Sequence, residues 1–344
     1  MQSDAGVLAV GSHVGAYTIG MPIGIGGIGV VYEATTPEGA HVALKMLRPE
    51  QREIDDARRR FHDEAIAGMT TKHPGVASTL AYGVTADGTP FLVMERVRGE
   101  TLADRVRNGR PLSLFRSAAI MRQILAGLQS MHDAGIVHGD VKSDNVLVDT
   151  QQDGDVAKLI DFGLARVQFT KTDVGSESGE PVVAGTPEYM APEVIRGLGA
   201  SPASDLYAAG VLLFELITGT TPFAGGTIEQ VMRGQVADPP VPPSLRRPAT
   251  PPILDRIVMR ALEKDPALRF PNPATFASAL RVAMSVLDNV DDEPGTTGFS
   301  REAPTLDFVL RGTVERVRYR RLAKGTPAPA RLNDGDHRHV ERGD

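Results

Sequence analysis

The sequence predicts an α+β fold of two lobes, a small one built mainly of strands and a larger one built mainly of helices. Residues 15 to 100 contain short β-branched and apolar runs that glycine-rich turns interrupt. From about residue 111, apolar residues instead recur at spacings of three and four, as in amphipathic helices. A mostly-β segment followed by a mostly-α segment favours two packed units with a cleft between them.

The composition is that of an ordinary globular protein, and it excludes several functions. The 344 residues can bury a large core, and 41% of them are hydrophobic and 23% charged. A net charge of −6 gives no reason to expect nucleic acid as a partner. The chain has no cysteine, which excludes disulfides, thiolate chemistry and cysteine-based zinc sites.

Neither a signal peptide nor a membrane span is expected. The N-terminus lacks a basic stretch followed by a sustained apolar run. The most apolar stretch, "YAAGVLLFELITG" at residues 207–219, is too short to cross a bilayer and contains Glu215 near its centre. We therefore expect a cytoplasmic protein with no membrane span.

The predicted first lobe contains a hairpin, a helix and a further strand. The runs "GVVYEAT" (29–35) and "HVALKML" (41–47) have the composition of strands, and "PEGA" between them is typical of a turn. The arginine-rich "DDARRRFHDEAIAGM" (55–69) has helical composition. The run "FLVMERV" (91–97) again indicates a strand.

The predicted second lobe begins with "SLFRSAAIMRQILAGLQSMHDAG" (113–135), an amphipathic pattern that a glycine ends. The proline-rich "DPPVPPSLRRPATPP" (238–252) indicates a rigid connection between helices, with a ligand for a polyproline-binding domain as the alternative. Residues 288–344 are polar with little periodicity, so we expect a poorly ordered tail. Its basic run "VERVRYRRLAK" leaves contact with an acidic partner or a membrane surface as the alternative.

The run "GIGGIG", Gly24 to Gly29, fits the pattern G-x-G-x-x-G. Glycines let a backbone approach phosphate closely because no Cβ intrudes. A dinucleotide-binding turn would need a helix directly after these glycines. The predicted hairpin follows instead, and this order suits a flap that folds over a nucleotide.

Lys45 in "VALK" stands within an apolar strand, where burial of an ammonium group requires an anionic partner. Glu64, on the following predicted helix, can supply that carboxylate. The alternative is a lysine that points from an edge strand into water. Lys45 taken alone leaves both interpretations open, and the anion-binding one needs an anion and a carboxylate nearby.

Two later motifs combine a base with metal ligands. In "HGDVKSDN" (138–145), Asp140 can accept a proton from an attacking hydroxyl, Lys142 can hold a phosphoryl group, and the amide oxygen of Asn145 can bind Mg²⁺. The motif "DFG" follows the apolar "VAKLI", so Asp161 stands at a strand end and can bridge Mg²⁺ to phosphate. Each motif alone is weak, but their joint order and spacing is specific.

These motifs in this order resemble those of protein kinases, and most closely the bacterial eukaryotic-like Ser/Thr kinases, over roughly residues 15 to 286. The resemblance implies a bilobal protein-kinase fold. The small, mainly β N-lobe with one key helix would be residues 15–97, and the larger, mainly α C-lobe residues 98–287. A nucleotide cleft lies between the two lobes in this family. Residues 1–14 would be a leader and 288–344 the tail.

The resemblance implies a role for each motif residue. Asp140 would be the catalytic base and Lys142 would contact the γ-phosphate. Lys45 would hold the α- and β-phosphates while paired with Glu64. Asn145 and Asp161 would hold the metal. The residues implied to surround ATP are Gly24, Ile25, Gly26, Gly27, Ile28, Gly29, Val31, Ala43, Lys45, Met94, Glu95, Val97 and Leu147, with Met94 as gatekeeper and the main chain of Glu95 and Val97 on the adenine.

The same resemblance implies substrates and architecture. ATP and Mg²⁺ would be the cofactors, with Mn²⁺ as an alternative metal, and the acceptors would be protein Ser/Thr hydroxyls because Lys142 and Thr186 match Ser/Thr kinases. The run "GTPEYMAPE" (185–193) resembles the end of the segment that shapes the acceptor groove. Glu193 would pair with Arg269, and Asp205 would brace the catalytic loop. Related kinases dimerise through the N-lobe, so a homodimer stays open.

Two departures from the family pattern concern control. Gly68, one turn after Glu64, stands where many kinases have a bulky apolar residue. Gly139 replaces the arginine that often precedes the catalytic aspartate, and that arginine commonly binds an activating phosphate. We therefore expect activity that needs no phosphorylation of the segment between Asp161 and Glu193. The candidate autophosphorylation sites there are Thr170, Thr172, Ser176 and Ser178.

Two rival functions share this fold. A nucleotide-responsive scaffold without phosphoryl transfer usually lacks the lysine, the base or the metal-binding aspartate, and all of these are present here. A small-molecule kinase seldom has a segment like "GTPEYMAPE". The sequence therefore favours an active Ser/Thr protein kinase, a transferase with protein substrates.

Overall fold

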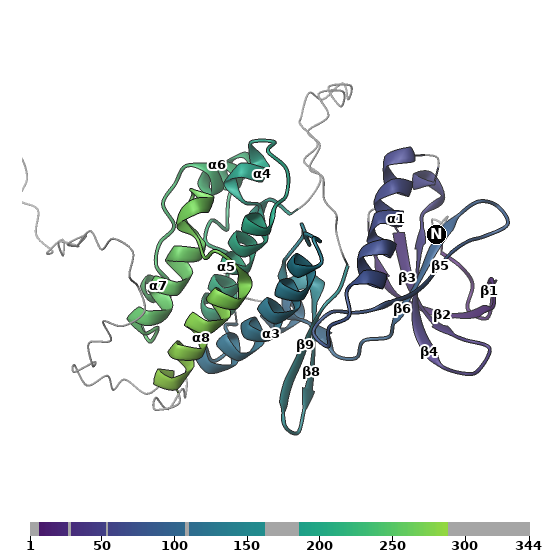
Figure 1. Ribbon diagram of the computed structural model, residues 1–344, viewed down its shortest axis with the longest axis horizontal. Coiled ribbons are helices and arrows are strands. Elements are labelled where there is room, and N and C mark those ends of the chain that lie inside the picture. Colours follow the sequence, from purple (N-terminus) through teal and green to yellow (C-terminus); the bar gives the residue numbers. More distant parts are fainter. Residues whose placement is uncertain (1–6, 27–28, 53, 107–109, 162–185, 288–344) are drawn as a thin grey trace, which may run out of the picture. The chain divides into compact units, whose positions relative to one another are not determined.

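A computed structural model describes residues 7–26, 29–52, 54–106, 110–161 and 186–287 (Figure 1). The first part of the chain forms an antiparallel six-stranded sheet with the strand order β1-β2-β3-β4-β6-β5 and one long helix, α1. The element bounds are β1 His13–Val14, β2 Tyr17–Ile25, β3 Gly29–Thr35, β4 His41–Leu47, η1 Pro49–Gln51, α1 Asp55–Thr70, β5 Thr79–Val84 and β6 Pro90–Glu95.

The hairpin predicted from the sequence is present as β3 and β4. Its turn closes where the backbone N–H of Gly39, at φ +85°, donates to the carbonyl of Thr36 at 2.9 Å. The register pairs Val31 with Lys45. Because directly paired residues in an antiparallel sheet point to the same side, this register decides which residues share a face.

Helix α1 packs on the sheet through a small apolar cluster of its own. Phe61 and Ala65 of the helix lie in this cluster with Leu47 and Leu92 of the sheet, and all four are buried. This packing fixes the rotation of α1 and turns Glu64, the neighbour of Ala65, toward strand β4. The N-lobe therefore sets the position of Glu64 by ordinary hydrophobic packing.

The second part of the described chain is mainly helical, as the sequence predicts. Helix α5 is almost wholly buried and packs against α3 and α7, while α8 also packs against α3 and α7 (Figure 1). The bounds are β7 Glu100–Thr101, α2 Leu102–Val106, α3 Leu114–Asp133, η3 Ser143–Asn145, β8 Val146–Gln151, β9 Gly154–Leu159, η4 Pro187–Tyr189, α4 Pro192–Ile195, α5 Pro202–Thr218, α6 Ile228–Val236, η5 Pro243–Leu245, α7 Pro252–Ala261, η6 Pro266–Leu268 and α8 Pro273–Leu287.

The main helices start and stop at residues suited to capping. Ser113 accepts a hydrogen bond from the backbone N–H of Arg116 at the start of α3. Ser201 and Ser204 form a capping box at the start of α5, and Gly219, at φ +80°, ends that helix. The proline-rich stretch joins α6 to α7. Among the described residues, no helix combines the length and apolar character that a membrane crossing requires.

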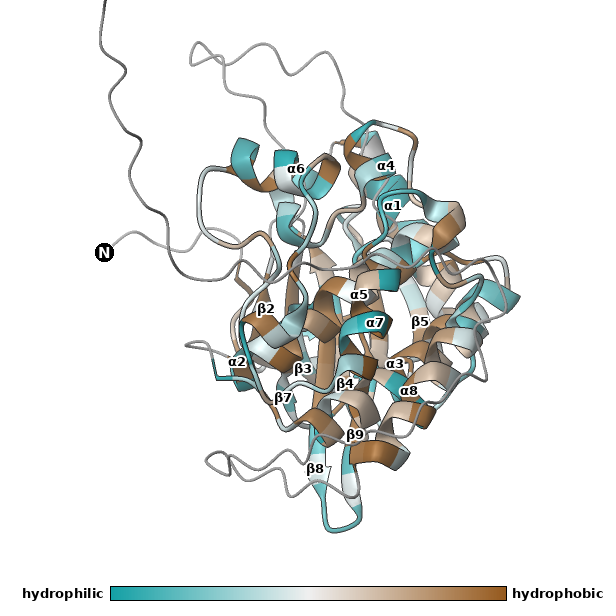
Figure 2. Cartoon of the chain, turned by 90° about the vertical axis from the view of Figure 1, so that its left-hand side faces the viewer, coloured by the Kyte–Doolittle hydropathy of each residue, from teal (hydrophilic) through white to brown (hydrophobic). Residues whose placement is uncertain are grey.

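Strands β7, β8 and β9 form a separate three-stranded sheet, and the turn of the β8–β9 hairpin is hydrophilic (Figure 2). The loop after α1 is joined to this sheet. The N–H of Ala77 donates to the carbonyl of Leu159, and the N–H of Leu159 donates to the carbonyl of Gly75, each at 2.9 Å. These bonds bring the end of β9, and with it Asp161, close to the first part of the chain.

Candidate active site

The glycine-rich run joins β2 to β3. Gly24 and Ile25 end β2, Gly29 begins β3, and the N–H of Gly26 donates to the carbonyl of Gly29 at 2.9 Å. A Cβ at residue 29 would stand 2.4 Å from the carbonyl oxygen of Met46, so only glycine fits. The predicted ATP-binding residues Gly27 and Ile28 lie outside the described residues.

One face of the sheet carries five of the residues predicted to surround the nucleotide. Val31 pairs with Gly24 on one side and with Lys45 on the other. Ala43 pairs with Met94. Since Ala43 and Lys45 are two residues apart on one strand, both pairs point to the same face. Leu147 belongs to the other sheet, on β8, where it pairs with Lys158 of β9.

Lys45 binds two carboxylates at the edge of this face. Its Nζ lies 2.7 Å from Oε1 of Glu64 and 2.9 Å from Oδ1 of Asp161. Burial acts to lower the pKa of Lys45, but Asp161 and Glu64 outweigh it, and the pKa is raised. Lys45 lowers the pKa of Asp161, whereas burial raises that of Glu64. The lysine therefore stays charged and tied to both lobes.

Asp205 of helix α5 accepts backbone hydrogen bonds from residues 138–145, the predicted catalytic loop. Its buried carboxylate accepts from the N–H of His138 at 2.9 Å and from the N–H of Gly139 at 2.8 Å. A third partner, Nε2 of His132, lies 2.8 Å away. Gly139 has φ +76°, a conformation in which a side chain is strained. The bracing role predicted for Asp205 is therefore present.

The three polar residues of the catalytic loop contact one another directly. The side-chain nitrogen of Asn145 donates to the backbone carbonyl of Asp140 at 2.9 Å and to its Oδ2 at 2.8 Å. The Nζ of Lys142 lies 2.8 Å from the same Oδ2 and donates to Oγ1 of Thr186 at 3.1 Å. Asp140, Lys142 and Asn145 thus form one cluster that faces Thr186.

Asn145 also links this cluster to Asp161. Its backbone carbonyl accepts from the N–H of Ile160 at 2.9 Å, which places Asp161 next in the chain beside the catalytic loop. The hydrogen bonds described for the Asn145 side chain use its nitrogen, which leaves the amide oxygen as a hard ligand. Asn145 and Asp161 therefore fit a magnesium ion that phosphate oxygens complete.

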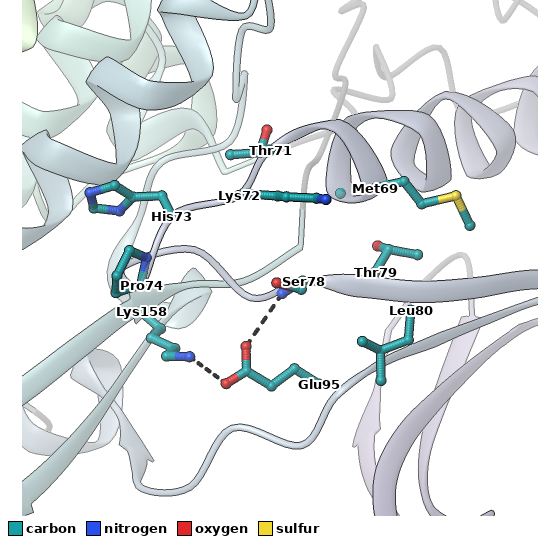
Figure 3. Close-up of a pocket in the computed structure, with 11 residues that line it drawn as sticks. Met69, Thr71, Lys72, His73, Pro74, Ser78, Thr79, Leu80, Glu95 and Lys158 are labelled. Carbon is teal, nitrogen blue, oxygen red and sulfur yellow. Dashed lines mark hydrogen bonds and ion pairs between the residues drawn. The ribbon is translucent and has the colours of Figure 1, made fainter.

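The predicted hinge, which contains Glu95 and Val97, has an internal backbone hydrogen bond. The N–H of Val97 donates to the carbonyl of Glu95 at 3.1 Å, so the two main-chain groups predicted for the adenine edge contact each other. Behind them lies a cavity of about 530 Å³ that Gly68, Met69, Thr79 and neighbouring residues line. Figure 3 shows the Glu95 carboxylate between Lys158 and the backbone of Ser78 in this cavity. The Glu95 side chain therefore joins the hinge to β9.

Residues 186–193, here called the acceptor segment, are anchored at several points. The Tyr189 hydroxyl donates to Oε2 of Glu215 at 2.5 Å and lies 2.9 Å from Oγ of Ser143 in the catalytic loop. Burial raises the pKa of Glu215. Farther along, the guanidinium of Arg269 grips both carboxylate oxygens of Glu193 at 2.6 and 2.8 Å, which is the predicted pairing.

Several of these anchors escape reasoning from motifs. Ser143, Tyr189 and Glu215 act through contacts between distant segments, and Gln235 of α6 also binds the acceptor segment. Ser143 and Tyr189 stand within quoted motifs, but the motifs do not indicate their contacts. Glu215 carries a signal of its own, because a carboxylate in the middle of an apolar helix needs a buried partner. No pattern in the sequence marks Gln235.

The family model described as protein kinase domain matches residues 17–278. The serine/threonine-protein kinase pkn3 of Myxococcus xanthus is 34% identical over 282 residues, which is 81% of this chain and 52% of that protein. PknD of Mycobacterium tuberculosis is 35% identical over 343 residues, 97% of this chain and 50% of that protein. The chain thus spans about half the length of these relatives.

Solved structures give the same result. The crystal structure of the M. tuberculosis PknI kinase domain superposes with a TM-score of 0.63 and 26% sequence identity. The match covers 81% of this chain and all of that domain. Its fold, like this one, combines a strand-rich N-lobe with a helical C-lobe. The chain belongs to the protein kinase family, and the two sequence relatives named above are bacterial Ser/Thr kinases.

Proposed function

We propose that the protein is a Ser/Thr protein kinase that transfers the γ-phosphoryl group of ATP to hydroxyls of proteins. The observation that carries this proposal is the joining of two clusters through Asn145. One cluster holds Lys45, Glu64 and Asp161, and the other holds Asp140, Lys142 and Asn145 itself. Phosphoryl transfer depends mainly on such positioning and charge stabilisation.

Each side chain then has a defined task. Asp140 accepts the proton of the attacking hydroxyl, whose oxygen bonds to the γ-phosphorus as the bond to the β–γ bridging oxygen breaks and ADP leaves. Lys142, which already contacts Thr186, balances charge on the transferred group. Lys45 holds the α- and β-phosphates, and Glu64 keeps its ammonium in place.

ATP and magnesium are the cofactors in this proposal. Magnesium would supply a positive charge that offsets the negative charge of the phosphates. Asn145 and Asp161 would hold it, and Mn²⁺, which accepts the same hard oxygen ligands, is the alternative. The glycine run, Val31, Ala43, Met94, Leu147 and the hinge would surround the rest of the nucleotide. On binding, the Glu95–Val97 hydrogen bond would be exchanged for bonds to adenine.

The catalytic loop also bears on control. At φ +76°, a residue with a Cβ would pay about 1–2 kcal/mol, which Gly139 avoids. Gly139 also lacks the positive charge that an activating phosphate would neutralise. We therefore infer that the loop reaches its working conformation without such a phosphate. Autophosphorylation at Thr170, Thr172, Ser176 or Ser178 is proposed too, but these residues lie outside the described part.

One experiment tests the function and its control together. Phosphatase-treated protein is given MgATP and a generic basic protein acceptor, beside an Asp140→Asn variant. We expect linear turnover without a lag from the wild type and a loss of about 10³-fold in the variant. Absence of transfer by wild type that still binds ATP would overturn the kinase assignment.

A variant with Ala at all four loop hydroxyls separates the control argument from the activity. We expect its rate to stay within a few-fold of the wild type. A hundredfold loss, equivalent to about 2.7 kcal/mol, or a lag that shortens with autophosphorylation, would refute the inference about Gly139.

A homodimer through the N-lobe is a second proposal. Strand β5 is an edge strand, and Leu80, Tyr82 and Val84 on its outward side are exposed. Exposed edges with apolar side chains favour pairing with another chain. Sedimentation should give a dimer for the wild type and a monomer for Leu80→Glu, whereas Leu245→Glu on the C-lobe should not change the state. A monomeric wild type across micromolar concentrations would exclude this interface.

A further inference from the structure

Gln235, near the end of helix α6, is a polar residue with no exposed surface. Both ends of its side chain are hydrogen-bonded. Its Oε1 accepts from the hydroxyl of Tyr207 at 2.5 Å, and its Nε2 donates to the backbone carbonyls of Glu188 and Pro187. A buried amide whose donors and acceptor are all engaged holds its partners in one arrangement.

Lys264 fixes Gln235 from the opposite side. Its Nζ donates to the backbone carbonyls of Gly234 at 3.0 Å and Gln235 at 2.7 Å, and to the hydroxyl of Tyr207 at 3.2 Å. The same ammonium lies 4.5 Å from the ring centroid of Phe223. A cation on the last carbonyls of a helix stabilises that end of the helix. Lys264 and Tyr207 together therefore hold Gln235 in place.

The two carbonyls that Gln235 binds belong to the acceptor segment. They lie between two residues of that segment that contact the catalytic loop. Thr186, which directly precedes Pro187, accepts the hydrogen bond from Lys142. Tyr189, which directly follows Glu188, contacts Ser143. The short turn between these contacts is thus attached to the catalytic loop at both ends and to Gln235 in the middle. A shift of the Gln235 amide would move Thr186 relative to Lys142.

We propose that Gln235, held by Tyr207 and Lys264, is a positioning residue that sets where the acceptor segment presents a protein hydroxyl to Asp140. This proposal rests on the proposed kinase function. Within the described residues, the side-chain hydrogen bonds of Gln235 go to Tyr207 and the acceptor segment, and none goes to a residue predicted for nucleotide binding. Its loss should weaken the use of the acceptor and leave the use of ATP unchanged.

The test is a Gln235→Met variant of the full chain, which keeps the approximate volume and removes the amide. We expect the KM for a protein acceptor to rise about tenfold, as for the loss of one or two buried hydrogen bonds. The KM for ATP and the slow hydrolysis of ATP without acceptor should stay within twofold. A merely structural role would change all of these together with the melting temperature.

Two further variants sharpen the test. Gln230→Met makes the same exchange on the same helix, where Gln230 caps Thr227 and does not bind the acceptor segment. It should leave the acceptor KM unchanged. Tyr207→Phe removes only the hydroxyl that holds Gln235, so its effect should be smaller. In a double variant with Gln235→Met, Tyr207→Phe should raise the acceptor KM no further, because both changes break the link from Tyr207 through Gln235 to the acceptor segment.

The outcomes separate this proposal from the kinase function itself. If the wild type transfers phosphate and Gln235→Met leaves the acceptor KM within twofold of it, Gln235 is not a positioning residue. An equal rise for Gln230→Met would likewise overturn the proposal, because the effect would then belong to the whole helix. If the wild type transfers no phosphate, the proposed function fails first, and ATP hydrolysis identifies that case.

Discussion

Lys45 and Lys264 are both removed at least partly from water, yet their surroundings shift their pKa values in opposite directions. Lys45 meets the carboxylates of Asp161 and Glu64, which outweigh the effect of burial and raise its pKa. Lys264 meets neutral carbonyls and a hydroxyl, so burial lowers its pKa to about 8, with partial relief from Asp238. The partner, rather than the depth of burial, decides the sign.

The two lysines lie on the two sides of the proposed active site. On the side proposed to bind the nucleotide, the charges of Lys45, Glu64 and Asp161 are tied to each other. On the other side, the Lys264 ammonium binds neutral carbonyls and a hydroxyl, and the neutral amide of Gln235 makes the contact to the acceptor segment. A neutral contact to that segment is useful because a charged group there would itself attract or repel substrates.

The largest expected effect comes from an exception to this contrast. Arg269 and Glu193 form a buried ion pair on the acceptor side. We expect Arg269→Met to lower the free energy of unfolding by about 3–5 kcal/mol, because Glu193 would be left as a buried unpaired charge. Urea unfolding measures this loss.

Arg116→Met provides the control, since its partner Asp155 keeps Arg105 and the Arg116 side chain is 38% exposed. It should cost about 1 kcal/mol or less. Equal losses for Arg269→Met and Arg116→Met would remove the distinction between buried and exposed pairs on which the contrast depends.

A smaller effect is expected where the two sides meet, at Gly139. Gly139→Ala should cost about 1–2 kcal/mol of stability because φ is +76°. Gly135, at φ +73° with open space around a Cβ, should show a similar stability loss on Gly135→Ala. Only Gly139→Ala should also lower kcat, since it bonds to Asp205 beside the base. Equal kcat values for the two variants would contradict this.

The last effect is the pH dependence that Lys264 confers on stability. Below pH 8 the lysine is protonated in both states, and the folded state bears the cost of burying the charge. Between about pH 8 and 10.5, the folded protein has released a proton that the unfolded chain still holds. Stability relative to Lys264→Met should therefore rise with pH across this range. Urea unfolding at several pH values checks this, and a constant or falling difference would show that the ammonium is not destabilised.

The sequence predicted those strands and helices whose own residues show a strand or helix pattern. The hairpin of β3 and β4 has the predicted bounds because alternating residues and a turn specify it locally. The helix bearing Glu64 and the long helix α3 were also predicted, each to within a few residues. The protein kinase fold that the resemblance implied is confirmed.

The candidate site was predictable mainly on its nucleotide side, although the Glu193–Arg269 pair of the acceptor segment was predicted too. Lys45, Asp140 and Asp161 belong to motifs because each acts through its own side chain, although their roles stay predictions. No motif marks Gln235, because its side chain binds backbone carbonyls, which any residue could supply. These carbonyls belong to a segment 47 residues away. Which backbone groups meet a buried amide is decided by the packing of whole helices.

The ion pair between Lys45 and Asp161 joins residues that are 116 positions apart in the chain. At the usual rate of about 5–20 residues per second, Asp161 is synthesised roughly 6 to 23 seconds after Lys45. Glu64 is only 19 positions from the lysine and is made within a few seconds of it. The growing N-lobe therefore holds Lys45 with only one of its two carboxylate partners until Asp161 has been made.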